Sequence, residues 1–314
     1  MSRLQHWRWR HWAKTGRPII IGPWRSEVGF ETLYWLPWLA KWRETYGISK
    51  DRLIVVTRGG AGIWYDAAQT VELYDYVPLE RLRKAMLADS QASGSVKQQR
   101  MTPWEDALLR VVAHDLGLRR YHVLHPSVIY NGLAPWWQGD WGLTAIQRQL
   151  AFGPLPVPHP PLNLPLPEKF VAVRFYARHT WPMTEEHQTW VTQLVERLSQ
   201  KIPVVNLSPN LATDDHVDFA LPPSVLTIHD HVTPQTNLAV QSAVLAKAAG
   251  FVGTYGGTMQ LAVRLKKPAV GVYHQFGGTA YAHKVLTEAV AVQQQTPLFI
   301  GRPTDAQYVA EVML

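Results

Sequence analysis

The chain has 314 residues, no cysteine and a net charge of +7, and 46% of its residues are hydrophobic. This length predicts about two domains with packed cores, and the lack of cysteine excludes disulfides, thiolate metal sites and a cysteine nucleophile. No apolar run approaches the roughly 20 residues that span a bilayer, and the charged start differs from a signal peptide, so we expect a cytoplasmic protein.

The excess positive charge lies in the first half of the sequence. Residues 1–153 contain 20 Lys and Arg against 13 Asp and Glu, whereas residues 154–314 contain 11 of each, and 12 of the 14 tryptophans also lie in the first half. This composition favours either an anionic or sugar-bearing partner that stacks on the rings, or a Trp-rich core beneath a solvated basic surface.

Residues 1–17 mix Trp7, Trp9 and Trp12 with basic side chains. Such a mixture is typical of contacts with lipid headgroups or with a nucleic-acid backbone. The helical amphipathicity is poor, so we expect a frayed terminus partly packed on the first domain. The alternative is a weak membrane-surface contact, which would place the protein peripherally at the inner face of the membrane.

The first half alternates strands with helices. In chain order we predict a strand at 18–23, a helix at 27–46 kinked by Pro37, a strand at 52–57, a glycine loop at 58–62, helices at about 78–90 and 103–117, and a strand near 121–125. Seven prolines between 151 and 167 then predict an extended, semi-rigid linker. We expect an N-terminal domain at 1–153, a linker at 154–167 and a C-terminal domain at 168–314.

The second half repeats the alternation. We predict strands at 170–176, 203–207, 225–228, 251–255, 269–273 and 298–301, and helices that begin after Thr184, after Thr233-Pro234, at Gly256-Gly257, near 279 and near Asp305. Right-handed crossovers would give each half a parallel sheet. The predicted fold is therefore α/β, with two Rossmann-like domains that face each other across a cleft.

The segment from Phe251 to Tyr273 is the most informative stretch. Its βαβ pattern places Gly256 and Gly257 at a helix N-terminus, beside Thr258. Unpaired backbone N–H groups and the positive end of the helix dipole favour a phosphate there, and the missing side chains allow close approach. We therefore expect a diphosphate to bind at this turn.

The same segment resembles the donor domain of the lipopolysaccharide heptosyltransferases, which belong to the GT-B glycosyltransferases. That family places Gly-x-Asp-Ser-Gly-x-x-His-Leu-Ala before a short helix and x-Pro-x-Val; the matching residues are Gly253, Gly257, Leu261, Ala262, Pro268 and Val270. Tyr255, Gly256 and Gln260 stand where the family has its acid, serine and histidine. The resemblance implies an acceptor-binding first domain and a second domain that binds a nucleotide diphospho-sugar, in part through these three residues.

Cationic residues near the predicted donor site suit this chemistry. Arg174 and Arg178 follow the first strand of the second domain, where a guanidinium would grip diphosphate and stabilise the leaving group in place of a metal ion. We expect His229 to contact base or ribose. A metal site at His229-Asp230-His231 or at 214–218 is the competing interpretation, but neither run has zinc-site spacing, and we predict no required metal or other cofactor.

The segment 22–31 is predicted to meet the acceptor, together with Arg58 and Asp66. Glu27 and Glu31 are four residues apart and would share one helical face. An inverting transferase needs a base for the acceptor hydroxyl, so we propose Glu27 or Glu31, with Asp66 and His125 as further candidates. Trp24 and Arg25 complete the predicted acceptor site. Alternatively, the two acids complement the helix dipole.

These features predict a glycosyltransferase that moves a sugar from a nucleotide diphospho-sugar to a hydroxyl of a glycan, a glycolipid or another lipid-linked acceptor, as in cell-envelope polysaccharide synthesis. A nucleotide-sugar epimerase is one alternative, because that chemistry also occurs on the GT-B fold, but an epimerase needs no acceptor and the basic, Trp-rich first half argues against it. A basic nucleic-acid-binding protein is another, but it leaves residues 253–270 unexplained, so we do not expect a nucleic-acid partner.

Overall fold

The computed structural model describes residues 3–94, 97–160, 164–178, 180–211 and 216–313. The chain divides into two compact units, Met1–Gly153 (unit 1) and Pro154–Leu314 (unit 2). Residues 154–160 and 164–167, at the start of unit 2, form no helix or strand. This is the stretch with the densest proline content, and proline removes the N–H donor that either kind of element needs.

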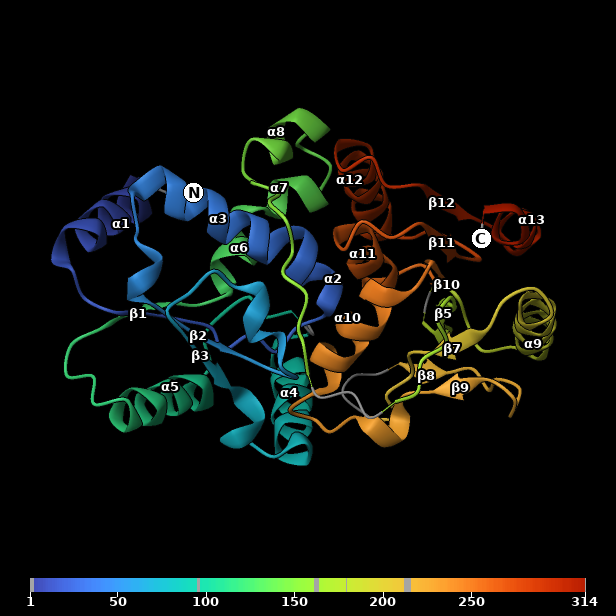
Figure 1. The fold of residues 1–314 in the computed structure, drawn as a ribbon. Helices are drawn as coiled ribbons and strands as arrows, with labels where there is room; N and C mark the ends of the chain where they lie inside the picture. The colour runs from blue at the N-terminus through green and yellow to red at the C-terminus, as the bar shows by residue number, and fades with distance from the viewer. Residues whose placement is uncertain (1–2, 95–96, 161–163, 179, 212–215, 314) are drawn as a thin grey trace. The chain divides into compact units, whose positions relative to one another are not determined.

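Unit 1 is built on a parallel sheet (Figure 1). Its strands are β1 Ile19–Ile21, β2 Leu53–Thr57, β3 Gln69–Glu72 and β4 His122–Leu124. Its helices are α1 Arg3–Thr15, α2 Val28–Phe30, α3 Leu36–Tyr46, α4 Leu79–Ser93, α5 Pro103–Asp115, α6 Ser127–Gly132, α7 Ala134–Trp137 and α8 Leu143–Gln147, with a π-helical segment at Glu31–Trp35 and short 3-10 turns at Lys50–Arg52, Ala61–Trp64 and Leu73–Asp75.

The strand order in unit 1 is β3-β2-β1-β4, and every pairing is parallel. Ile20, Ile54 and Val56 pack on one face against Leu109 and Val112 of α5. The connections run from β1 to β2 and β3 on one side and then return to β4 on the other side of β1. The order therefore reverses between β1 and β4, which is where open α/β sheets bind ligands.

Tryptophans form a large part of the core of unit 1. Trp35 and Trp38 stack with ring centroids 5.8 Å apart, and Trp24 and Trp42 extend the row at 5.7 and 6.2 Å. All 14 tryptophans lie in the described residues, and Trp7 is the one whose side chain is exposed. The high Trp content therefore reflects a Trp-rich core rather than an aromatic docking surface.

The helix predicted at 27–46 is confirmed as one uninterrupted helical run over 28–46, but part of it has a geometry that was not predicted. Glu27 precedes the helix in an extended conformation, and the segment Glu31–Trp35 is π-helical before α3 begins at Leu36. Pro37 lies in the first turn of α3, where its missing N–H is tolerated. Because Glu27 precedes the first helical residue, it does not share a helix face with Glu31, and its side chain is partly exposed whereas Glu31 is buried.

The prediction of a frayed N-terminus is wrong, because residues 3–15 form α1. Trp9 packs edge-on against Trp38 at 5.7 Å, and Trp12 stacks on His122 at 4.7 Å. Arg52 donates from Nη2 to the carbonyl oxygen of Trp12 at 2.7 Å. These contacts attach α1 to α3 and to the start of β4.

Unit 2 contains a larger parallel sheet. Its strands are β5 Val171–Arg174, β7 Val204–Asn206, β9 Leu226–Thr227, β10 Gly250–Thr254, β11 Ala269–Val272 and β12 Leu298–Gly301, and a short antiparallel pair is formed by β6 Tyr176–Ala177 and β8 Val217–Asp218. Its helices are α9 Glu185–Ser199, α10 Asn237–Lys247, α11 Gly257–Arg264, α12 Ala280–Gln293 and α13 Pro303–Met313, with a 3-10 turn at His229–His231.

The six strands of unit 2 have the order β12-β11-β10-β5-β7-β9. This is the doubly wound Rossmann order, in which the chain builds outward from β5 to β9 and then returns to place β10 beside β5. Helices α9 and α13 pack on one face through Val191, Leu194 and Ala306, while α10 and α11 lie on the other face (Figure 1). The predicted α/β class with a Rossmann-like parallel sheet in each half is confirmed.

One helix start in unit 2 was wrongly predicted. Helix α10 begins at Asn237 rather than directly after Thr233-Pro234. The carbonyl oxygen of Thr233 accepts the N–H groups of Thr236 and Asn237 at 3.1 and 2.9 Å, so these residues form a turn ahead of the helix. By contrast, Thr184 caps α9 as predicted, because its side chain accepts the His187 N–H.

Candidate functional site

The predicted donor-binding residues lie where the strand order of unit 2 reverses. Arg174 ends β5, and Thr254 ends the adjacent strand β10. Thr254 Oγ1 accepts the N–H of Tyr176 and donates to its carbonyl oxygen, both at 2.9 Å. These bonds hold the segment after β5 against the end of β10. The segment therefore enters the position at which nucleotides bind in doubly wound sheets.

Gly256 is the residue around which this corner is built. It caps α11, and a Cβ placed on it would lie 2.0 Å from Tyr176 Oη and 3.1 Å from Arg178 Nη1. The space that glycine leaves is thus occupied by the hydroxyl of Tyr176. This corrects the expectation of a bare cradle at Gly256, whereas the next residue, Gly257, remains partly exposed.

Arg178 adds positive charge at the same corner. Its backbone N–H and carbonyl oxygen both bond to Trp181 at 2.9 Å, which fixes a tight turn after β6. Its guanidinium lies against the N-terminus of α11, where the helix dipole is also positive. Two positive groups side by side repel each other unless an anion lies between them or beside them. The arrangement therefore suits a phosphate ligand.

Arg174 is held more tightly inside unit 2. Its Nη1 donates to Gln241 Oε1 at 3.2 Å, its Nε lies 3.5 Å from Asp218 Oδ1, and its guanidinium lies over the Tyr176 ring at 5.2 Å. The whole residue is 9% exposed. Because these contacts use its donors, Arg174 is placed to support Tyr176.

The other predicted donor-binding residues differ in how much of their surface is exposed to solvent. Tyr255 is buried and donates from its hydroxyl to the carbonyl oxygen of Ala280 at 3.0 Å, at the start of α12. Thr258 and Gln260 are each 5% exposed. His229 is partly exposed after β9, and its Nδ1 lies 2.9 Å from Thr227 Oγ1. Three strand spacings separate β9 from β10, a distance of roughly 14 Å.

No group of three His, Asp or Glu side chains among the described residues could hold a metal ion. His229 Nε2 instead lies 3.1 Å from Asp230 Oδ2. Asp214 and Asp215, which belong to the second run considered from the sequence, lie outside the described residues.

In unit 1, the loop after β1 carries the predicted base. Its backbone is fixed by hydrogen bonds from Gly22 N–H to the Leu124 carbonyl oxygen at 3.0 Å and from Trp24 N–H to the Val56 carbonyl oxygen at 2.9 Å. The carboxylate of Glu27 accepts from Lys97 Nζ at 2.7 Å, and 33% of the Glu27 side chain is exposed. Glu27 is thus a carboxylate that solvent can reach at the C-terminal edge of the sheet.

Glu31 does not share this position. It is fully buried and accepts hydrogen bonds from Tyr65 Oη at 2.5 Å, Thr57 Oγ1 at 3.1 Å and Arg58 Nη1 at 3.0 Å. Burial raises the pKa of Glu31, against the lowering effect of Arg58 and these hydrogen bonds. Both oxygens of Glu31 accept hydrogen bonds and the residue is buried, so Glu27 is the more accessible of the two candidate bases.

Arg58 and Arg25 are likewise buried, and their guanidinium groups form contacts inside unit 1. Arg58 pairs with Glu31 and also donates to the carbonyl oxygen of Ser26. Arg25 is 6% exposed, with Nε 2.8 Å from Glu105 Oε1 and Nη2 3.0 Å from Asp89 Oδ2. Both arginines therefore support the loop after β1 from its buried side.

Trp24 and Asp66, the other two residues predicted to contact the acceptor, lie in different surroundings. Trp24 is fully buried in the tryptophan row. Asp66 is exposed but pairs with Arg43 at 2.9 Å and with Lys50 at 3.3 Å. Because Lys50 precedes β2, Asp66 lies at the N-terminal edge of the sheet, opposite the edge that carries Glu27.

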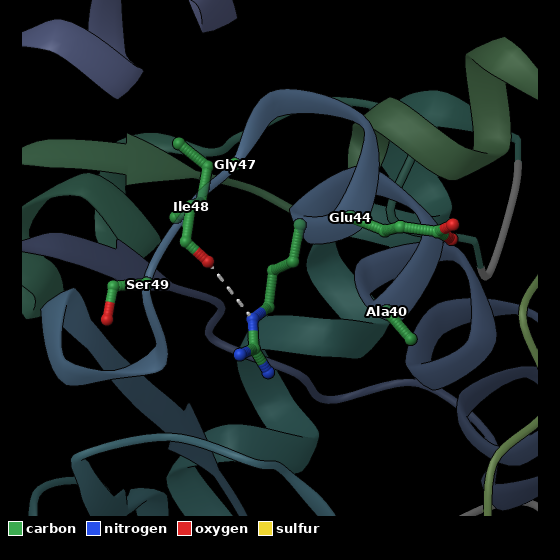
Figure 2. Close-up of a pocket in the computed structure, with 6 residues that line it drawn as sticks. Ala40, Glu44, Gly47, Ile48 and Ser49 are labelled. Carbon is green, nitrogen blue, oxygen red and sulfur yellow. Dashed lines mark hydrogen bonds between the residues drawn. The ribbon is translucent and has the colours of Figure 1, made fainter.

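A surface hollow of about 470 Å³ lies near the same N-terminal edge of unit 1 (Figure 2). It is lined by Ala40, Arg43, Glu44, Gly47, Ile48 and Ser49. Arg43 donates from Nε to the Ile48 carbonyl oxygen at 3.5 Å, the bond drawn as a dashed line in Figure 2. None of the residues predicted to act on a substrate lines this hollow.

Some residues of the unit 1 network have no role in the sequence interpretation. Glu105 bonds to Arg25 and caps α5 with Thr102, and its Oε2 lies 3.4 Å from His125 Nε2. Burial would raise the pKa of Glu105, but His125 and Arg25 outweigh it and lower that pKa to about 2. The Thr-x-x-Glu pattern at 102–105 is a capping-box signature that predicts this cap. The pairing of Lys97 with Glu27 could not be predicted from a local sequence pattern, because 70 positions separate the two residues.

No family model matches the chain, and no curated protein matches it. Among solved structures it is similar to the bacterial iron-containing dodecameric glycosyltransferase TibC from enterotoxigenic E. coli H10407, with 13% identity, a TM-score of 0.44 and coverage of 82% of this chain; this chain spans 58% of TibC. It is also similar to E. coli heptosyltransferase WaaC with ADP, with 17% identity, a TM-score of 0.42 and coverage of 95% of this chain and 98% of that one.

A third similar structure is the E. coli ADP-heptose lipopolysaccharide heptosyltransferase II, with 12% identity, a TM-score of 0.42 and coverage of 89% of this chain and all of that one. The similar structures thus include lipopolysaccharide heptosyltransferases, the group that the sequence resembles. Because the sequence identities and TM-scores are this low, the activity of this chain must be inferred from its own residues.

Proposed function

We propose that this protein is a glycosyltransferase whose unit 2 binds a nucleotide diphospho-sugar and whose unit 1 receives a hydroxyl acceptor. The observation that carries the proposal is the position of Arg178 against Gly256 at the reversal point between β5 and β10. A guanidinium beside a helix N-terminus suits the diphosphate of a departing nucleotide, since both groups stabilise the negative charge that develops on it.

The proposed chemistry needs one base and one leaving group. The acceptor oxygen attacks the anomeric carbon and loses its proton to the carboxylate of Glu27, while the bond from that carbon to the diphosphate oxygen breaks. The nucleoside diphosphate leaves with the electron pair, and Arg178 and the N–H groups that open α11 stabilise its charge. The partial exposure of Glu27 and its position after β1 support its role as the base.

The neighbours of these residues have positioning roles in the proposal. Tyr176 fills the space above Gly256 and is backed by Arg174 and by His216, whose ring lies 4.2 Å from the Tyr176 ring. In unit 1, Ser26 is held by Arg58 and by Tyr130, whose hydroxyl donates to Ser26 Oγ at 2.7 Å. The loop that presents Glu27 is therefore fixed from its buried side.

Calorimetric titration with a panel of nucleoside diphosphates tests the donor site. We expect at least one of ADP, GDP, UDP, CDP and dTDP to bind, and Arg178→Ala to weaken that binding by at least about tenfold because a charge-assisted contact is lost. Lys247→Ala removes an exposed cation at the end of α10, on the opposite edge of the sheet, and should leave the affinity unchanged. If none of the panel binds, the donor assignment fails.

Activity measurements then separate transfer from other uses of a nucleotide-sugar. Glu27→Gln should lower kcat by about 100-fold or more while the affinity for nucleoside diphosphate is kept, because a general base contributes that much. Glu44→Gln, an exposed acid on α3, is the matched control. Conversion of donor without any acceptor would instead indicate an epimerase, and oligonucleotide binding without nucleotide binding would indicate a nucleic-acid-binding protein.

A further inference from the structure

Helix α1 carries an outward face that the proposed sugar transfer does not use. The described residues contain no helix long and apolar enough to cross a membrane. Leu4 and Trp7 are nevertheless 73% and 65% exposed on α1, while Trp9 and Trp12 on the same helix are buried. The exposure of two large apolar side chains on a helix anchored by two others requires a reason beyond packing within unit 1.

The spacing of the exposed residues gives this face a definite composition. Leu4, Trp7, His11 and Lys14 follow one another at intervals of three, four and three, which places them in one stripe along the helix. Arg3, Arg8 and Arg10 are exposed beside this stripe, and residues 3–17 contain no acidic residue. The outward face is therefore apolar at its N-terminal end, through Leu4 and Trp7, and is otherwise polar and cationic.

The anchoring of α1 keeps this face turned outward. Trp9 lies against Trp38, Trp42 and Tyr46 of α3, and Trp12 stacks on His122. Helix α1 lies beside α3 in unit 1 (Figure 1). Because the two inner tryptophans are held by the core, the helix cannot rotate to bury Leu4 and Trp7 without losing these contacts.

We propose that the outward face of α1 docks on the surface of an anionic lipid bilayer. Tryptophan and leucine partition into the boundary between headgroups and acyl chains, while arginine and lysine at the flanks pair with lipid phosphates. A nucleic acid would use the cations but would gain nothing from Leu4, and the Trp7 ring already stacks on His11 at 5.8 Å. This proposal does not depend on sugar transfer.

Vesicle co-sedimentation of the full chain tests the proposal. We expect binding to vesicles of phosphatidylcholine with phosphatidylglycerol, little binding to phosphatidylcholine alone, and a decrease as salt is added. Arg3→Glu with Arg10→Glu should weaken partitioning at least about tenfold. The control, Arg81→Glu with Arg83→Glu on α4, changes the net charge equally and should have a much smaller effect.

The apolar contribution has its own pair of variants. Leu4→Ser with Trp7→Ser should weaken binding to anionic vesicles by several-fold, whereas Val292→Ser with Tyr308→Ser, at positions 80% and 72% exposed in unit 2, should not. All four side chains are at the surface, so circular dichroism should show the same fold in each variant. Absence of binding to anionic vesicles, or equal binding by the α1 variants and the wild type, would overturn the proposal. Oligonucleotide binding that the Arg3/Arg10 variant abolishes, without vesicle binding, would assign the face to nucleic acid.

Discussion

Replacing Gly256 with alanine should destabilise unit 2. The new Cβ would lie 2.0 Å from Tyr176 Oη and 3.2 Å from Tyr176 Cζ, and this tyrosine is 1% exposed. The ring is confined between His216 and Arg174, so it cannot move aside freely. Overpacking of this kind costs about 1–3 kcal/mol, which corresponds to a fall in melting temperature of roughly 2–12 °C for a unit of this size.

Thermal denaturation of four variants isolates the cause: Gly256→Ala, Tyr176→Phe, the two combined, and Gly277→Ala. Tyr176→Phe removes the nearest atom, so adding Gly256→Ala in that background should cost less than half of what it costs in the wild type. Gly277→Ala is the control, because a Cβ there would meet no atom within 4 Å. An unchanged melting temperature for Gly256→Ala, or an equal loss in both backgrounds, would refute the packing of Tyr176 on Gly256.

Two further predictions concern the buried charges of unit 1. Arg58→Met should destabilise the unit by about 3–5 kcal/mol in chemical denaturation, because it leaves the Glu31 carboxylate buried without its cation; adding Glu31→Gln should restore part of the loss, and a cost under about 1 kcal/mol would contradict this role. The pKa of Glu105 is about 2 in the folded chain, against an ordinary value of 4.5, so its contribution to stability is present above pH 4.5 and is lost as the pH falls towards 2. The stability difference between wild type and Glu105→Gln should therefore shrink across this interval, and a constant difference would contradict the pairing of Glu105 with Arg25 and His125.

The alternation of strands and helices could be predicted from the sequence because the signals are local. Ile19–Ile21 and Gly250–Thr254 are short apolar runs bounded by proline or glycine, and Thr184 caps α9 through a bond three residues away. β3 at Gln69–Glu72 was missed, because it lies at the edge of the sheet and only Val71 of its four residues is buried. Residues at an edge strand need not alternate in hydrophobicity.

The exposure of individual side chains could not be predicted in the same way. Glu27 and Glu31 have the same chemistry and nearly the same position in the chain, yet one is partly exposed and the other is sealed by Arg58, Tyr65 and Thr57. Glu27 is the extended residue that precedes the helix, and a sequence does not locate the first residue of a helix this finely. Tryptophan is equally ambiguous, since Trp7 and Trp9 lie two residues apart on opposite faces of α1.

The sequence predicts where the corner at Gly256 lies, but it does not predict that a side chain fills the space above this glycine. Its glycines mark the turn from β10 to α11, and the parallel order places it beside β5. That Tyr176 would fill the space above Gly256 depends on the course of β6, which pairs with β8 about 40 residues further along the chain. A long-range pairing of two-residue strands leaves almost no local pattern.

Crystals soaked with the nucleoside diphosphate that binds best would test the central claim most directly. The account predicts diphosphate oxygens at about 3 Å from the backbone N–H of Gly257 or Thr258 and from the Arg178 guanidinium. Diphosphate bound elsewhere, such as the hollow beside Arg43, with the corner at Gly256 unchanged, would contradict it.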